Sequence, residues 1–300
     1  MTLLKKNISF LLQNSFKKDL ILIWTLRIAA LLSGFVFILI LVFVTIESMP
    51  VLNHTKLTAF FTDSSWHPKE NLFNLVPMIF GSILSSIGAI VIAAPLGILS
   101  AIFCSYYAPL PVAWSYRRMI ELLSGIPSVV YGLWGLTVLV PLVGDRFPPG
   151  AGLLSGIIIL SIMILPTMAL TADASFSAVP KQYLNAAAAL GLSKSRTVFE
   201  VIIPFAKPAL LTGLILQAGR ALGETMAILM VAGNVVQIPT SIFSPVRTLT
   251  ANIALEMAYA DDNHRSALFF SGLILIITLL VLVSVTELLK PKSFGEFLNA

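Results

Sequence analysis

The chain has 300 residues, of which 57% are hydrophobic and only 11% are charged. Soluble globular domains carry roughly 25% charged residues, so this composition excludes a chain that faces water on all sides and indicates one that faces lipid. The net charge of +5 comes from Lys and Arg scattered through short segments rather than gathered in one patch, which argues against a nucleic-acid-binding protein. The one cysteine, Cys104, excludes an intramolecular disulfide framework, and we expect it to pack in its apolar surroundings.

Apolar stretches long enough to cross a bilayer recur along the chain. A hydrocarbon core about 30 Å thick needs about 20 apolar residues in a helix. The stretches that meet this requirement are 22–46, 74–103, 119–143, 152–172, 208–236 and 267–288. The first is too long for a signal-peptide core and no small-residue cleavage site follows it, so we expect a retained helix. The sequence therefore predicts an all-α, polytopic integral membrane protein with about six transmembrane helices.

The distribution of positive charge predicts the orientation of these helices. With the N-terminus inside, 12 Lys and Arg residues lie on the cytoplasmic side and 5 on the opposite side, while Arg27 and Arg220 lie within spans. The positive-inside rule then places both termini in the cytoplasm. The expected segments are a cytoplasmic N-terminal segment (1–21), a first transmembrane helix (22–46), a periplasmic loop (47–73), a core of five transmembrane helices (74–290) with a long cytoplasmic loop (173–207), and a cytoplasmic tail (291–300).

The cytoplasmic loop 173–207 has the pattern of two short helices around a glycine turn. Pro180 and the alanine run at 186–189 favour a first helix, and Gly191 is a natural left-handed cap that ends it. Ser193 is a good cap for a second helix, Lys194 to about Ile203, which we expect Pro204 to terminate. The small residues of this loop predict a flat face that another protein could grip.

This loop resembles the cytoplasmic loop of ABC importer permeases, which carries Glu-Ala-Ala, then a glycine, then an apolar-Pro end. Ala186-Ala187, Gly191 and Ile202-Ile203-Pro204 match that pattern at the family's spacing, whereas Asn185 replaces the glutamate. The resemblance implies contacts with a partner ATPase at Asn185, Ala186, Ala187, Gly191 and Pro204. Because Asn185 keeps hydrogen bonding but lacks the charge, we expect docking to depend mainly on backbone shape and apolar contact. The alternative is an ordinary amphipathic loop helix.

Two further stretches narrow the resemblance. They are residues 121–135, Glu-Leu-Leu-Ser-Gly-Ile-Pro-Ser-Val-Val-Tyr-Gly-Leu-Trp-Gly, and residues 219–227, Gly-Arg-Ala-Leu-Gly-Glu-Thr-Met-Ala. Both are similar to permeases of bacterial phosphate-specific ABC importers, and the second is nearer to the C-type subunit than to its A-type partner. The resemblance implies a type I ABC importer permease fold in the inner membrane. It also implies a homologous second permease in a heterodimer, two ATP-binding subunits and a periplasmic phosphate-binding protein.

Two charged residues lie inside the predicted fifth span. A charge at mid-bilayer costs about 2.5–3.5 kcal/mol on insertion scales, so Arg220 and Glu224 are expected to face protein or water. Their i, i+4 spacing predicts one helix face, with Gln217 beside them. Gly219 and Gly223 form a small-xxx-small step that would let another helix approach. One interpretation is a structural ion pair. The other, which we favour, is a substrate path in which Arg220 binds a tetrahedral oxyanion such as phosphate and Glu224 neutralises it when the path is empty.

The third span contains a helix break at Gly125 and Pro127. Broken helices in transporters often line the substrate route, although a plain proline kink is the alternative. The expected substrate path consists of Arg220, Glu224, Gln217, Thr225 and Ser128.

No catalytic or metal-binding constellation is evident in the sequence. The three histidines fall in expected outer loops, and the phosphate-binding pattern Gly-x-x-x-x-Gly-Lys-Ser/Thr does not occur, so we expect no cofactor, no metal and no ATP hydrolysis by this chain. The predicted function is that of a permease subunit importing inorganic phosphate by alternating access, energised by a partner ATPase. The alternatives are an ABC permease for another oxyanion such as molybdate or sulfate, a secondary anion carrier, and a membrane scaffold or sensor.

Overall fold

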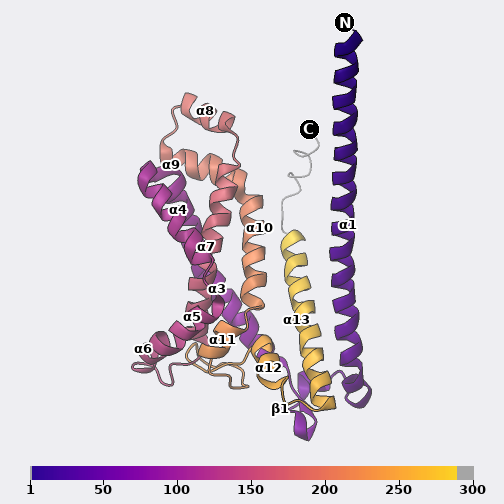
Figure 1. The fold of residues 1–300 in the computed structure, drawn as a ribbon. Helices are drawn as coiled ribbons and strands as arrows, with labels where there is room; N and C mark the ends of the chain where they lie inside the picture. Colours follow the sequence, from indigo (N-terminus) through magenta and orange to yellow (C-terminus); the bar gives the residue numbers. More distant parts are fainter. Residues whose placement is uncertain (1, 289–300) are drawn as a thin grey trace.

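The computed structural model describes the backbone of residues 2–288, and the expected tail at 291–300 lies outside the described residues. Helices make up most of the described chain (Figure 1). They are α1 (Thr2–His54), α2 (Ala59–Thr62), α3 (Val76–Ile102), α4 (Leu110–Ser124), α5 (Ser128–Trp134), α6 (Val140–Gly144), α7 (Leu153–Ser177), α8 (Lys181–Ala189), α9 (Lys194–Arg196), α10 (Ile203–Leu222), α11 (Met226–Val231), α12 (Leu249–Glu256) and α13 (Asp262–Leu288). Strands β1 (Trp66–His67) and β2 (Leu72–Phe73) form a small antiparallel hairpin around a 3₁₀ turn, Pro68–Glu70.

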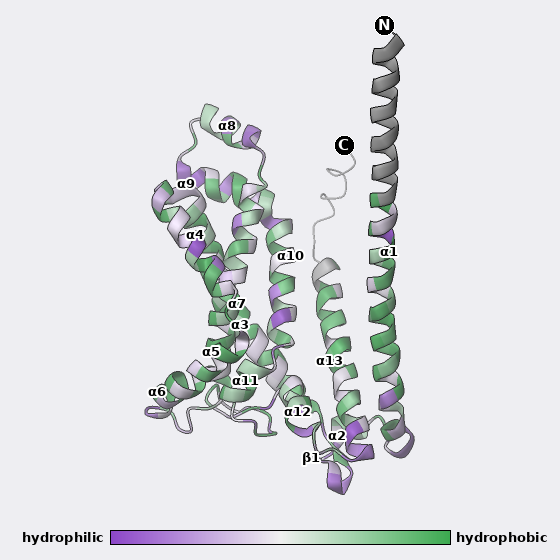
Figure 2. Ribbon diagram, viewed as in Figure 1, coloured by the Kyte–Doolittle hydropathy of each residue, from purple (hydrophilic) through white to green (hydrophobic). Residues whose placement is uncertain are grey.

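Five of the described helical segments are long and apolar enough to span a membrane, and a bent helix pair makes a sixth. The bent pair joins Leu110–Ser124 to Ser128–Gly144 at an angle of 90°, so the predicted third span begins earlier than expected and is broken. Hydrophobic residues cover the middle of the bundle, and hydrophilic residues gather near α8 and α9 and at the opposite end (Figure 2). The prediction of an all-α, multi-pass membrane protein is confirmed, with one two-stranded hairpin added.

The centre of the bundle is the contact between α3 and α7. Small residues on α3 allow this close approach: a Cβ added at Gly97 would lie 2.9 Å from Cγ of Met168. Close backbone approach through small residues is the usual way in which membrane helices gain packing contacts. By contrast, α1 packs along α13, where Phe43 meets Phe269 edge to face at 5.7 Å. The side chains of α1 from Leu22 to Leu39 are exposed in this chain, as expected for a helix that faces lipid.

The predicted fifth span, 208–236, is wrong at both ends. The helical segment begins at Lys194, continues through a π-helical turn (Thr197–Ile202) into α10, and ends at Leu222. Pro204 was expected to end a helix but instead lies in the first turn of α10. A proline lacks the N–H for an i→i−4 bond, and the wider π-helical turn just before it lets the chain continue without that bond.

Two of the outer loops expected from the sequence, 47–73 and about 237–266, are also folded structures. The first, 47–73, contains the end of α1, α2 and the hairpin, and its Phe60 and Phe73 are fully buried against Phe270 of α13. The last contains α12, and α13 already begins at Asp262. Both loops lie at the end of the bundle opposite α8 (Figure 1). The hydrophobic periodicity of the sequence did not predict these elements, because their apolar residues pack against partners far away in the sequence.

Candidate substrate path and coupling loop

The helix that carries Arg220 ends just beyond it, at Leu222. Gly223 occupies the cap position, and the chain restarts as α11 only at Met226. The Glu224 carboxylate accepts the backbone N–H of Ala227 at 3.1 Å, as an acidic group at a helix start commonly does. The prediction that Arg220 and Glu224 share one continuous helix face is therefore wrong. No ion pair joins them within the described chain.

Arg220 is exposed, and its guanidinium makes no ion pair or hydrogen bond with the residues that the structure describes. Its charge is close enough to the Tyr131 hydroxyl on α5 to act on it electrostatically. An arginine in the membrane-spanning part of a chain needs water, a partner protein or an anion around it. The Arg220 guanidinium is therefore free to receive an external ligand in this conformation.

The second helix break lies between α4 and α5, where Gly125 caps α4 and Pro127 precedes α5. The Tyr131 hydroxyl spans it by donating to the carbonyl oxygen of Leu123 at 2.9 Å. Ser128 is half-buried in the first turn of α5, three residues before Tyr131 and so on the same helix face. Tyr131 is thus a site residue that sequence reasoning missed, because nothing in the linear pattern shows that its hydroxyl reaches across the break to Leu123.

The segments that follow the two breaks pack directly on each other. A Cβ added at Gly132 of α5 would lie 2.9 Å from Cα of Ala227 on α11. Ala227 is the residue whose N–H the Glu224 carboxylate caps. The structure therefore brings together the break between α10 and α11 and the break between α4 and α5, which lie about 100 residues apart in the sequence.

Gln217 and Thr225 lie differently from expectation. Gln217 is buried, and its side-chain oxygen accepts the Thr167 hydroxyl of α7 at 2.7 Å, so it faces the interior and not the exposed side of Arg220. Thr225 lies in the break and its hydroxyl bonds only the nearby Gly223 carbonyl, at 3.3 Å. The Glu224 carbonyl oxygen accepts the hydroxyl of Thr250, on α12, at 2.7 Å. Thr250 is a second contact that sequence reasoning missed.

The loop between α7 and α10 has the predicted helix, glycine turn and second helix. Gly191 has φ of +68°, and the Ser193 side chain accepts the N–H of Arg196 at 3.4 Å. Ala187 is buried against the bundle, while Asn185 and Ala186 are exposed. Two large apolar side chains nearby are also uncovered, Leu190 at 79% and Phe199 at 58% exposure. This end of the molecule therefore presents a small-residue helix with apolar neighbours.

The fold is that of the membrane-spanning permeases of ABC importers. A permease chain of a bacterial alginate ABC transporter, solved with its alginate pentasaccharide-bound periplasmic protein, superposes with a TM-score of 0.63 over 90% of this chain and 94% of its own. The identity between the two is 15%, so this likeness concerns the fold alone.

Sequence comparison gives the family. The model of the binding-protein-dependent transport system inner membrane component matches residues 93–293. The phosphate transport system permease protein PstC of Mesorhizobium japonicum is 38% identical over 75% of this chain and 76% of its own length. PstC of Xylella fastidiosa is 35% identical over 79% of this chain and 80% of its own length. The chain belongs to the binding-protein-dependent transport permeases and, within them, to the group that carries the name PstC.

Proposed function

We propose that this chain is a permease subunit of an ATP-driven importer that carries inorganic phosphate across the bacterial inner membrane. The observation that carries the proposal is the free guanidinium of Arg220 in the last turn of α10, directly before the break that leads to α11. A guanidinium fork matches the oxygens of a tetrahedral oxyanion and binds them through charge-assisted hydrogen bonds. Support for phosphate as the cargo comes from the phosphate transport permeases to which the chain is 35% and 38% identical.

The proposed substrate path runs along the exposed side of the two breaks. In this proposal Arg220 binds the anion, and Ser128 and Thr225 line the path at the two breaks, where backbone groups freed from the helices face water. Glu224 sets the geometry of the break by capping α11. Gln217 supports the path from behind through Thr167. The exposure of Arg220 in the single chain is consistent with a path that a second, homologous permease completes.

The proposed site of ATPase coupling is the loop that contains Asn185, Ala186, Ala187, Gly191 and Pro204. Its exposed small residues and the uncovered Leu190 and Phe199 suit burial against another protein. Two ATP-binding subunits would dock on this chain and on its partner permease, and their closure would move α8 against the bundle. This chain would hydrolyse no ATP itself.

The proposed orientation places α8 and both termini in the cytoplasm, and the hairpin and α12 in the periplasm, where a phosphate-binding protein would dock. Cysteine labelling tests it, because Cys104 is the one native cysteine and is buried. In a Cys104→Ser background, His67→Cys should react with an impermeant maleimide on intact spheroplasts. Leu190→Cys should react only after lysis. The reverse pattern would overturn the orientation.

The cargo is tested by reconstituting this chain with its partner permease, ATPase and binding protein in proteoliposomes. Radiolabelled phosphate should enter only with ATP and the binding protein, and excess sulfate or molybdate should leave uptake unchanged. ATP-driven uptake of sulfate or molybdate in place of phosphate would establish the other-oxyanion alternative. Anion uptake by this chain alone without ATP would establish the secondary carrier.

A further inference from the structure

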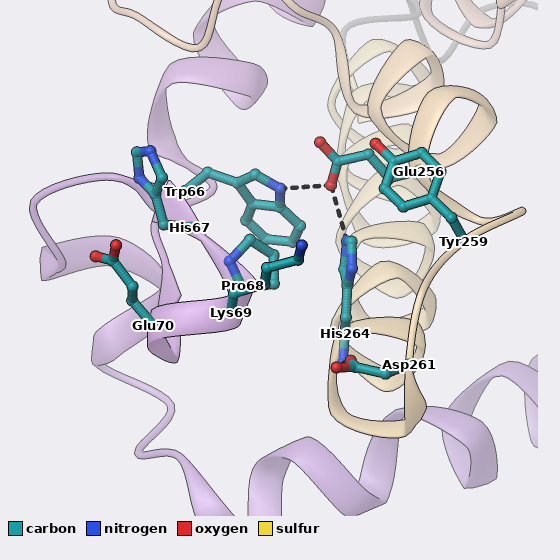
Figure 3. Close-up of a pocket in the computed structure, with 9 residues that line it drawn as sticks. All are labelled: Trp66, His67, Pro68, Lys69, Glu70, Glu256, Tyr259, Asp261 and His264. Carbon is teal, nitrogen blue, oxygen red and sulfur yellow. Dashed lines mark hydrogen bonds and ion pairs between the residues drawn. The ribbon is translucent and has the colours of Figure 1, made fainter.

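A buried carboxylate, Glu256, joins three separate segments at the end of the molecule opposite α8. Its Oε1 accepts from Nη1 of Arg247 at 2.6 Å. Its Oε2 accepts from Nε1 of Trp66 at 2.8 Å and lies 2.8 Å from Nε2 of His264. Figure 3 shows the Trp66 and His264 contacts meeting at one oxygen, with Trp66 on the hairpin side and His264 on α13. The Glu256 side chain, at the end of α12, thus connects the 47–73 segment, the segment before α12 that carries Arg247, and α13.

The burial of this cluster makes it a firm connection. The side chains of Glu256 and Arg247 are 11% and 18% exposed, and that of His264 is 10% exposed. Removing one partner of a buried charge pair leaves the other charge without compensation, so such a cluster resists separation. Arg247 extends it, because its Nε donates to the carbonyl oxygen of Asn234, just after α11.

Glu256 is the last residue of α12, an eight-residue helix whose other end reaches the substrate path. A helix of that length spans about 12 Å at about 1.5 Å per residue. At its start, Thr250 donates its hydroxyl to the Glu224 carbonyl oxygen at 2.7 Å. The same end is held to α3, because the N–H of Leu249 donates to Oγ of Ser82 at 2.9 Å. A shift of the Glu256 end of α12 therefore moves Thr250, and the hydrogen bond of Thr250 passes this movement to the break that contains Glu224.

We infer that Glu256 is a positioning residue for transport. It couples the surface formed by the hairpin and the start of α13 to the break between α10 and α11, and α12 is the connection between them. The inference rests on the proposed function, in which the substrate-binding protein docks on this surface. Docking that moves the hairpin moves Trp66, and Glu256 passes this movement to α12. Thr250 then moves the Glu224 carbonyl, and with it the loop that follows Arg220.

The test uses the complete complex in proteoliposomes and separates coupling from folding. Glu256→Gln keeps an acceptor for Trp66 but removes the charge shared with Arg247 and His264. Thr250→Val keeps the side-chain shape but removes the bond to Glu224. Each variant should lower the stimulation of ATPase by the loaded binding protein, and phosphate uptake, by about tenfold, within the usual range for coupling between sites. Basal ATPase and the yield of assembled complex should remain at the wild-type level.

Two matched controls accompany these variants. Asp145→Asn changes an exposed carboxylate that lies after α6, outside this surface, and has no ion pair in the described chain, and Thr212→Val changes an exposed hydroxyl whose printed bond is to the Pro208 carbonyl of its own helix. Both controls should transport like the wild type. A loss as large in Asp145→Asn as in Glu256→Gln would overturn the inference, since it would show a response to the loss of any carboxylate charge outside the docking surface.

The double variant Glu256→Gln/Thr250→Val decides the mechanism. If α12 carries one signal, the double variant should be no worse than the more damaged single variant, because the two changes interrupt the same connection. Multiplicative losses would overturn the inference. Trp66→Phe replaces Glu256→Gln in the cycle if the latter fails to assemble. A wild-type complex that hydrolyses ATP but moves no phosphate would refute the proposed cargo. Phosphate transport with multiplicative losses would refute only the inference.

Discussion

The hydroxyl of Tyr131 donates to the carbonyl oxygen of Leu123 at 2.9 Å across the break between α4 and α5. Leu123 lies in the last turn of α4, where helix carbonyls lack partners within the helix. The Leu123 carbonyl oxygen also accepts the N–H of Ile126 at 3.2 Å, and the Tyr131 hydroxyl adds a second bond to it from the other side of the 90° bend. The charge of Arg220 acts on the same hydroxyl, which relates this side chain to the Arg220 site as well as to the bend.

Replacing Tyr131 by Phe should loosen this bend. The loss of one hydrogen bond to a backbone group costs about 1 kcal/mol, which predicts a drop of a few degrees in the melting temperature of the detergent-solubilised complex. Phosphate uptake should fall several-fold, because the Ser128 and Arg220 sides of the path no longer keep one geometry. Tyr259→Phe is the control, since Tyr259 is 68% exposed. Equal melting temperatures for the two variants would show that the bend does not depend on Tyr131.

Replacing Arg220 by Gln should reduce phosphate uptake by at least tenfold while the complex still assembles. The physical reason is that an amide provides hydrogen bonds but neither the charge nor the bidentate fork for an oxyanion. Lys207→Gln removes an exposed positive charge from the same helix and should have little effect. Co-purification of the partner subunits measures assembly. Normal transport by the variant would show that Arg220 does not bind the anion. A failure to assemble would favour a structural role for Arg220.

Replacing Gly191 by Pro should abolish co-purification of the ATPase. Gly191 has φ of +68°, whereas the proline ring fixes φ near −65°, so the turn between α8 and α9 cannot form. Gly191→Asn is the informative control, because asparagine tolerates the left-handed conformation better than other residues with a side chain. A Cβ at this position meets no heavy atom within 4 Å, so the control adds no clash. ATPase recovery at the wild-type yield with the proline variant would contradict the assigned role of this turn.

Replacing Asp173 by Asn should destabilise the contact between α4, α7 and the π-helical turn at Phe103–Tyr107. The Asp173 carboxylate accepts from Nη2 of Arg117 at 2.9 Å and from the Ser105 hydroxyl at 2.5 Å. With side chains 40% and 20% exposed, the Arg117–Asp173 pair is partly screened, so we expect a loss of about 1 kcal/mol. Glu121→Gln interrupts the more exposed pair with Arg118, at 62% and 48%, and should leave the melting temperature unchanged. An equal fall in melting temperature in the two variants would show that burial does not distinguish the two ion pairs.

The sequence by itself determined the class of fold and the local structure of the loop around Gly191. Continuous apolar stretches can be detected without tertiary information, because crossing the hydrocarbon core requires a length of helix. Gly191 and Ser193 could be assigned their turn and cap because both depend on local backbone geometry. The break at Gly125 and Pro127 was predictable for the same reason. The continuation of the helix through Pro204 was not predictable, because it depends on the π-helical turn directly before α10, which lets the chain continue without the hydrogen bond that proline lacks.

Only the tertiary structure decided the geometry around Arg220. A helical repeat places Arg220 and Glu224 on one face, but that holds only while the helix continues, and here Glu224 caps the next helix instead. Trp66 and Glu256 are 190 positions apart, and no local pattern relates them. Contacts of this kind depend on how the helices pack, and packing brings together side chains whose distance along the chain carries no signal. The turn at Gly191 and the cap at Ser193 could therefore be predicted from the sequence, whereas the partners of the charged residues could not.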